Sequence, residues 1–121
     1  MHQSFFKSDY PLAKRVEISS KIRLKYPDRI PVIVERDTRV KTYAPEIQKN
    51  KYIVPMDITI GKFMFELRRH MTLSEEQAIF IYVQDQIPPT SAHISEIYNK
   101  FKDEDGFLYV SYAGESAFGT P

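Results

Sequence analysis

The sequence predicts an α+β fold, in which a four-stranded mixed sheet packs on a central helix and two extra helices stand at the N-terminus. One observation is the order of the hydrophobic patterns: two helical segments, then strand, strand, helix, strand, helix and strand. Another is segment 29–36, RIPVIVER, whose nearly continuous apolar run is typical of a strand covered on both faces. The third is the length of 121 residues, which suffices for one domain with its own core.

The first 26 residues are expected to be helical. Ser4 can cap a very short helix that Pro11 ends, and a second helix follows over residues 12–25. Ile18 and Ile22 lie four residues apart and therefore on one side of that helix. We interpret the rest of its surface as solvated and basic, because five cations occupy it: Lys14, Arg15, Lys21, Arg23 and Lys25. The Pro27–Asp28 pair stops the helix.

The remaining elements alternate between strand and helix patterns. Strands are expected over residues 29–36, 51–55, 78–84 and 107–112, the last one opened by Gly106. Thr59 can cap a helix over 59–70, and Ser91 is placed to cap another over 93–102. This order fits a β-grasp, ubiquitin-like sheet wrapped over one helix. We therefore divide the chain into a helical extension (1–26), a ubiquitin-like domain (27–112) and a flexible tail (113–121).

Composition excludes several classes of function. Seventeen basic and sixteen acidic residues leave a formal charge of +1, so no overall field recruits nucleic acid. There are no cysteines, which removes thiolate chemistry and fits a reducing cytosol. The longest apolar runs have the length of strands, and the N-terminus has no apolar signal core. The three histidines show no metal-ligand spacing, and we expect no cofactor, no metal and no enzymatic activity.

Four segments carry a resemblance that covers residues 10–119 almost without gaps. They are KIRLKYPDRIPVIVER (21–36), KYIVPMDITIGKF (51–63), YVQDQIPPTSA (82–92) and EDGFLYVSYAGESAFG (104–119). These blocks resemble the autophagy-related ubiquitin-like modifiers, the relatives of microtubule-associated protein light chain 3 and GABA-receptor-associated protein. The resemblance implies a ubiquitin-like fold and a protein that acts as a modifier.

The resemblance also implies a role for the last residues, FGTP. A cysteine protease trims family members to a terminal glycine, which activating and conjugating enzymes then join to phosphatidylethanolamine. Gly119 matches that glycine, so the expected cut lies between Gly119 and Thr120, with Phe118 as an anchor for the protease. Glycine suits this chemistry because it has no Cβ to block attack on its carbonyl. We expect a cytoplasmic protein that resides on autophagosomal or other vesicle membranes once it is lipidated.

In the same family, the strand that matches residues 51–55 accepts an extended peptide by strand addition. The peptide inserts an aromatic residue and, three positions later, an aliphatic residue into two pockets. By resemblance, the aromatic pocket is lined by Ile22, Pro31, Lys51, Ile53 and Phe107. The aliphatic pocket is lined by Tyr52, Val54, Pro55, Ile58, Phe63 and Leu67. Arg29, Arg68 and His70 supply flanking charge, and the implied ligands are cargo receptors with acidic residues beside the motif.

Three residues depart from the family pattern near these pockets. His70 stands where a third basic residue is usual, and a histidine is charged only in part at neutral pH. Our hypothesis is that peptide affinity rises on acidification. Glu66 replaces a common apolar residue beside the aliphatic pocket, and Ile18 replaces an acidic residue near the aromatic pocket. These changes leave the choice of ligand open.

Other interpretations of the same features stand beside this one. Alternating apolar residues on a strand are more often core than groove, and a terminus can end in Phe-Gly by chance. A binding-only trafficking or cytoskeletal adaptor would keep the groove without processing the tail. The basic helix would suit acidic tubulin, although such charges more often only solvate a helix. The fate of Gly119 separates the modifier from the adaptor.

Overall fold

The computed structural model describes residues 4–39, 44–73 and 77–114. These residues form four helices and four strands, in the order that the sequence predicts. The helices are α1 (Phe5–Asp9), α2 (Leu12–Lys25), α3 (Ile60–Arg68) and α4 (Ile94–Phe101). The strands are β1 (Arg29–Arg36), β2 (Lys51–Pro55), β3 (Ile79–Tyr82) and β4 (Leu108–Gly114). No helix among them is both long and apolar enough to cross a membrane.

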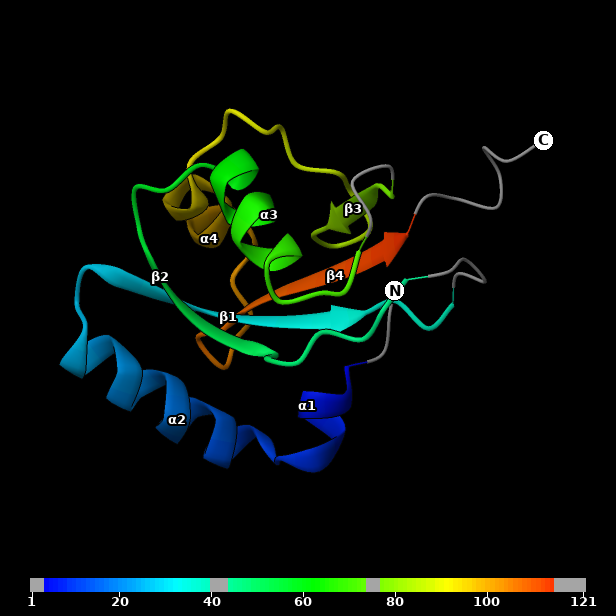
Figure 1. Ribbon diagram of the computed structural model, residues 1–121. Helices are drawn as coiled ribbons and strands as arrows, with labels where there is room; N and C mark the ends of the chain where they lie inside the picture. The colour runs from blue at the N-terminus through cyan, green and yellow to red at the C-terminus, as the bar shows by residue number, and fades with distance from the viewer. Residues whose placement is uncertain (1–3, 40–43, 74–76, 115–121) are drawn as a thin grey trace.

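The strands form one mixed sheet in the order β2-β1-β4-β3. The central strands β1 and β4 run parallel, and each edge strand runs antiparallel to its neighbour. Helices α1 and α2 lie on one face of the sheet, and α3 and α4 lie on the other (Figure 1). This arrangement confirms the predicted β-grasp, ubiquitin-like fold with two N-terminal helices.

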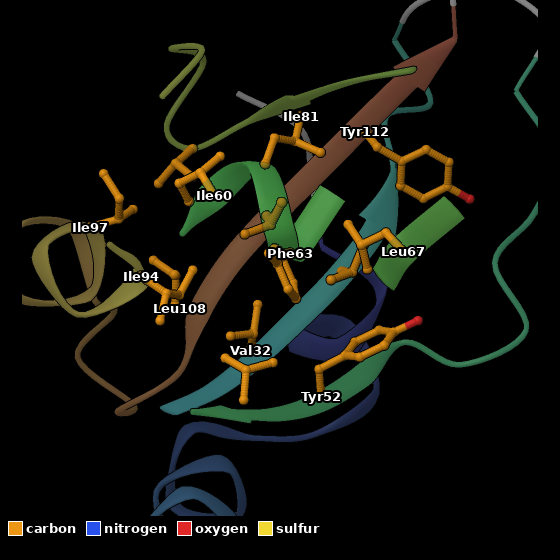
Figure 2. Close-up of a cluster of buried hydrophobic side chains, with 14 of the residues drawn as sticks. Val32, Tyr52, Ile60, Phe63, Leu67, Ile81, Ile94, Ile97, Leu108 and Tyr112 are labelled. Atoms are coloured by element: carbon orange, nitrogen blue, oxygen red, sulfur yellow. The ribbon is translucent and has the colours of Figure 1, made fainter. Parts of the chain in front are cut away.

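The main core lies between the sheet and the helices α3 and α4. Alternate residues of β1, beginning with Ile30, point into it, and Phe63 and Leu67 of α3 meet them there with no exposed surface. Figure 2 shows Val32, Phe63 and Leu67 among the side chains that converge from the sheet and from α3 and α4. Because alternation in a strand sends successive side chains to opposite faces, the other residues of β1 face α1 and α2.

A second, smaller core lies under the N-terminal helices. It consists of Phe6, Ile33 and Phe107, with Ile18 and Ile22 of α2 packed against it. The ring of Phe6 meets that of Phe107 edge-on at 5.2 Å between centroids. Both faces of β1 are therefore covered, as its continuous apolar sequence predicts, and Ile18 and Ile22 share one side of α2 as expected.

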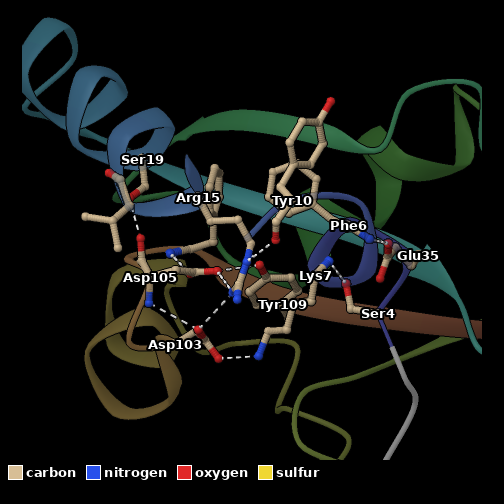
Figure 3. A network of polar contacts seen from close by, with 12 residues as sticks. Ser4, Phe6, Lys7, Tyr10, Arg15, Ser19, Glu35, Asp103, Asp105 and Tyr109 are labelled. Carbon is tan, nitrogen blue, oxygen red and sulfur yellow. Dashed lines mark hydrogen bonds and ion pairs between the residues drawn. The ribbon is translucent and has the colours of Figure 1, made fainter. Parts of the chain in front are cut away.

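A buried polar network fixes α2 to the turn before β4 (Figure 3). Arg15 donates to Asp105 at 2.6 Å, the Tyr109 hydroxyl donates to the same carboxylate oxygen at 2.5 Å, and the Ser19 hydroxyl donates to the Asp105 carbonyl. Arg15 is 9% exposed and Asp105 is 1% exposed. The prediction that Arg15 belongs to a solvated basic face was therefore wrong. Its partner lies 90 positions away, and periodicity cannot reveal such a distant partner.

The helix caps follow the sequence with one exception. Ser4 and Thr59 accept backbone N–H groups of α1 and α3, as predicted. The prediction of Ser91 as the cap of α4 was wrong, because His93 occupies that position. Glu96 accepts the backbone N–H of His93 at 3.0 Å and completes a capping box. This reciprocal pair replaces the hydroxyl that the sequence suggested.

Several element ends differ from the predicted ones by one or two residues. Helix α3 ends at Arg68, so His70 lies just beyond it, and β3 is confined to Ile79–Tyr82. Strand β4 continues through Ala113 and Gly114, which the sequence assigned to the tail. These two residues remain in the strand because they pair with Phe80 and Ile79 of β3.

Candidate functional site

The outer edge of β2 is the natural place for a further strand to pair. The backbone of Val34 donates to Asn50 just before β2, and Met56 donates to Asp28 just after it. In an antiparallel ladder, the residues that exchange hydrogen bonds alternate with those that do not. Even-numbered residues of β2 therefore pair with β1, and the backbone groups of Lys51 and Ile53 face outward. Pro55 ends the strand, as proline does on sheet edges.

The side chains of β2 alternate between the two faces of the sheet. Tyr52 and Val54 are buried in the main core beside α3. Lys51 and Pro55 are exposed on the other face, toward α2, and Ile53 is half-buried there. A peptide added to this edge would therefore have two separate surfaces beside it, one toward each helical layer.

The residues predicted for the aromatic pocket gather on the α2 face. Pro31 of β1 pairs directly with Ile53 of β2, so their side chains share that face. Ile22 of α2 packs against the small core to which Phe107 belongs. Phe107 is fully buried, so it can form only the floor of such a pocket.

Five of the six residues predicted for the aliphatic pocket gather on the α3 face. Phe63 and Leu67 belong, with Tyr52 and Val54, to the main core and have no exposed surface. Ile58 packs against that core and is half-buried, whereas Pro55 is exposed on the α2 face of β2 and does not join it. The chain thus brings the other five residues together as a largely closed cluster.

Tyr52 has an unusual environment within this cluster. The residue is 5% exposed, and its hydroxyl is the one fully buried side-chain polar atom of residues 4–39, 44–73 and 77–114 without a hydrogen-bond partner. Its ring meets those of Phe63 and His70 edge-on, at 6.0 and 5.6 Å between centroids. Burial, together with the nearby Tyr112, raises the pKa of Tyr52 to about 12. The hydroxyl therefore stays neutral at physiological pH.

Charged residues lie beside β2 and along α3. Arg29 lies 3.4 Å from the outward carbonyl of Ile53 and could meet an approaching peptide there. Arg68 and His70 are half-buried at the end of α3. Glu66 interacts with Lys62 and Arg69 at 3.9 and 3.4 Å, so its carboxylate is engaged along the helix surface. Sequence reasoning did not find these pairs.

The predicted processing site lies outside the described residues. Phe118, Gly119 and Thr120 follow β4, whose last described residue is Gly114. Gly114 itself pairs with Ile79 of β3, the edge strand on the other side of the sheet from β2.

Comparison with known proteins gives a consistent result. A model of the family described as "Autophagy protein Atg8 ubiquitin like" matches residues 14–119. The chain is 57% identical to Autophagy-related protein 8 of Dictyostelium discoideum, over 99% of this chain and 98% of that protein. It is 53% identical to Autophagy-related protein 8c of Arabidopsis thaliana, over 98% of each chain.

Solved structures show the same similarity. Trypanosoma brucei ATG8 superposes with a TM-score of 0.87 at 39% identity, over 97% of this chain and 99% of that chain. Plasmodium falciparum Atg8, solved in complex with a P. falciparum Atg3 peptide, superposes with a TM-score of 0.83 at 36% identity. That match covers 94% of this chain and 98% of the other. The protein belongs to the Atg8 family of autophagy-related ubiquitin-like proteins.

Proposed function

We propose that this protein is a modifier that is cut after Gly119 and joined through that glycine to phosphatidylethanolamine. Its family membership and the Phe-Gly-Thr-Pro terminus support the proposal. A processing cysteine protease would release Thr120 and Pro121, and activating and conjugating enzymes would carry the glycine carboxylate to the lipid amine. The lipid brings two acyl chains at once, and two chains anchor a protein where one chain is marginal.

The conjugating enzyme is the partner for which a relative offers direct support. Plasmodium falciparum Atg8 was solved with an Atg3 peptide, and it shares the fold of this chain. We infer that the corresponding conjugating enzyme binds this protein in the same pathway. The protein would reside in the cytoplasm before lipidation and on autophagosomal or other vesicle membranes afterwards.

The free edge of β2 is the observation that carries the recruiting part of the function. Backbone groups of Lys51 and Ile53 face outward, which suits pairing with an extended peptide of a cargo receptor. Side chains three positions apart in such a peptide point to opposite sides of the edge. An aromatic residue would then reach the α2 side, over Ile53, and an aliphatic residue would reach the α3 side.

The two sides of this edge differ in how much apolar surface they already expose to a peptide. The α2 side already presents Lys51 and Ile53 at the surface, whereas Phe63 and Leu67 of the α3 side are closed into the core. Binding would therefore require side chains on the α3 side to move, and such changes are common at interfaces. The proposed effect of His70 on peptide affinity stays a prediction.

Calorimetric titration of the full chain with a short aromatic-x-x-aliphatic peptide tests the groove. Ile53→Ser should weaken binding about tenfold, since it removes the buried area of an isoleucine, worth about 1.5 kcal/mol. Phe80→Ser is the matched control, because Phe80 is an exposed apolar residue on β3, the edge strand at the other side of the sheet. Equal effects of the two substitutions would contradict a peptide site at β2.

Methylating the peptide backbone separates strand addition from simple side-chain contact. N-methylation of the residue that faces Ile53 removes one donor and should abolish most of the affinity, while N-methylation of the next residue should not. The binding-only adaptor, with tubulin as its partner, shares this groove and would give the same result. Only the fate of Gly119 separates the adaptor from the modifier.

A further inference from the structure

A cavity of about 390 Å³ lies on the α1 side of the sheet, away from the β2 edge. It is formed by α1, the strands β1 and β4, the end of β3 with the turn that follows, and the end of α4 with the segment that follows. Its volume is within the range of sites that hold small ligands or single side chains of a partner. The proposed peptide groove uses none of its lining residues.

The lining combines aromatic rings with carboxylates. Rings come from β3, the end of α4 and β4, and carboxylates come from β1, the turn after β3 and the segment after α4. The rings are Tyr82, Phe101 and Tyr109, and the carboxylates are Glu35, Asp85 and Asp103. Glu35 is only 7% exposed, and one of its oxygens accepts the backbone N–H of Phe6 at 2.9 Å. Rings beside carboxylates are the surroundings that favour an organic cation.

Lys7 of α1 shows how this cavity holds an ammonium group. Its Nζ atom lies 2.5 Å from Asp103 and 4.6 Å from the centre of the Tyr109 ring. Figure 3 shows the Lys7 side chain reaching from α1 to Asp103 beside Tyr109. The Lys7 side chain is 39% exposed, so the ammonium enters the cavity from a helix at its rim. Burial alone would raise the pKa of Asp103, but the hydrogen bond from Lys7, together with the Asp105 backbone N–H and the Arg15 charge, lowers it.

We propose that this cavity is a second binding site, which takes the lysine side chain of a partner protein. A lysine from outside would use the contacts that Lys7 now makes, with the Asp103 carboxylate and the Tyr109 ring. The remaining volume, bordered by Tyr82 and Glu35, can receive the stem of that side chain and the chain that carries it. Lys7, which reaches the site from α1, then competes with the lysine of the partner for Asp103 and Tyr109.

Two arginines outside the cavity partly neutralise the carboxylates that line it. Arg39 pairs with Asp85 at 2.6 Å, and Arg15 lies 3.8 Å from Asp103. Neither arginine lines the cavity, whereas Lys7 does. Removal of the Lys7 charge should therefore affect a bound cation more than removal of any other lysine of the N-terminal helices.

The test is a titration of the full chain with a capped pentapeptide, acetyl-Gly-Ala-Lys-Ala-Gly-amide, followed by amide chemical shifts. Lys7→Met removes the resident ammonium and keeps an apolar stem of similar length. It should tighten binding about fivefold, the factor that corresponds to about 1 kcal/mol between unit charges 4 Å apart in water. Lys14→Met is the matched control, because it removes the same charge from α2 at a residue whose partner is Glu17.

Two further titrations test whether binding depends on the ammonium of the peptide and on the Asp103 carboxylate. The same peptide with norleucine in place of lysine should not bind, and Asp103→Asn should abolish binding of the lysine peptide. Thermal unfolding reports whether each variant is folded, and Phe6 still anchors α1 in the small core without Lys7. Equal affinities for Lys7→Met and Lys14→Met, binding of the norleucine peptide, or shifts confined to β2 would each overturn the proposal.

Discussion

Arg15 of α2 and Asp105 form an ion pair of 2.6 Å that is buried although the two residues lie 90 positions apart. Tyr109 donates to the same carboxylate oxygen. Burial, and to a smaller extent this hydrogen bond, raises the pKa of Tyr109. The pair fixes α2 to the turn before β4, and Ile22 of α2 packs on the small core that contains Phe107. The N-terminal helices are thus packed on the sheet, and the proposed peptide site draws on α2 through Ile22.

Removing one partner of this pair should be costly. Arg15→Met leaves the Asp105 carboxylate buried without its cation, which typically costs about 3–5 kcal/mol. We expect a loss of free energy of unfolding of about 3 kcal/mol in chemical denaturation, because the Tyr109 hydroxyl remains. Lys21→Met is the control, since its partner Glu17 lies on the solvent side of α2. Similar losses for the two variants would contradict the structural role of Arg15.

Gly106 should not tolerate a side chain. Its φ is +91°, and a Cβ atom there would lie 2.6 Å from the Ser19 hydroxyl, which belongs to the same network. Strain and the displaced Ser19 should reduce the stability of Gly106→Ala by about 1–3 kcal/mol. The matched change is Gly61→Ala in α3, where the nearest atom would be an ordinary 3.4 Å away. That variant should keep its stability or gain up to about 1 kcal/mol.

The Tyr52 hydroxyl predicts a substitution that stabilises. Tyr52→Phe keeps the ring contacts and removes a buried polar atom without a partner, so the free energy of unfolding should rise by about 1 kcal/mol. Tyr112→Phe is the opposite case, because its hydroxyl donates to the Pro45 carbonyl at 2.7 Å. It should lose about 1 kcal/mol. If both variants lose stability equally, Tyr52 has a partner that this structure does not show.

The buried tyrosines also predict the response to alkaline pH. Burial raises the pKa of Tyr52 to about 12, while an unfolded tyrosine titrates near 10. A raised pKa in the folded state stabilises the protein fully below about pH 10 and less as the pH rises through the folded value. Ionisation of the buried tyrosines, monitored by tyrosinate absorbance, should therefore coincide with unfolding, monitored by circular dichroism. Both should occur between about pH 10 and 12. Ionisation of all tyrosines in a protein that stays folded would contradict this.

The sequence predicted the sheet and most of the caps because those signals are local. RIPVIVER is apolar on both faces, and the hydroxyls of Ser4 and Thr59 precede helical patterns that the structure confirms. The resemblance implied that residues 51–55 accept a peptide by strand addition, which needs an edge strand, and the sheet order places β2 at an edge.

Local patterns failed where the partner is distant in sequence. Arg15 looked like one more cation of a solvated helix, because Asp105 joins it only after the chain has folded. The cap of α4 was misplaced because the Glu96 carboxylate completes a box with His93 that no hydroxyl marks. The cavity beside Lys7 escaped notice for the same reason, since its lining comes from five separate segments.

The most direct measurement is the intact mass of this protein recovered from the cells that make it, compared with a Gly119→Ala variant. The proposed function predicts loss of Thr120 and Pro121, followed by a gain equal to one phosphatidylethanolamine that is absent from the variant. The groove variant Ile53→Ser should still acquire the lipid if peptide binding and the chemistry at Gly119 are separate. An unprocessed mass throughout, including under starvation, would contradict the modifier and leave the β2 edge as the functional site of a binding-only adaptor.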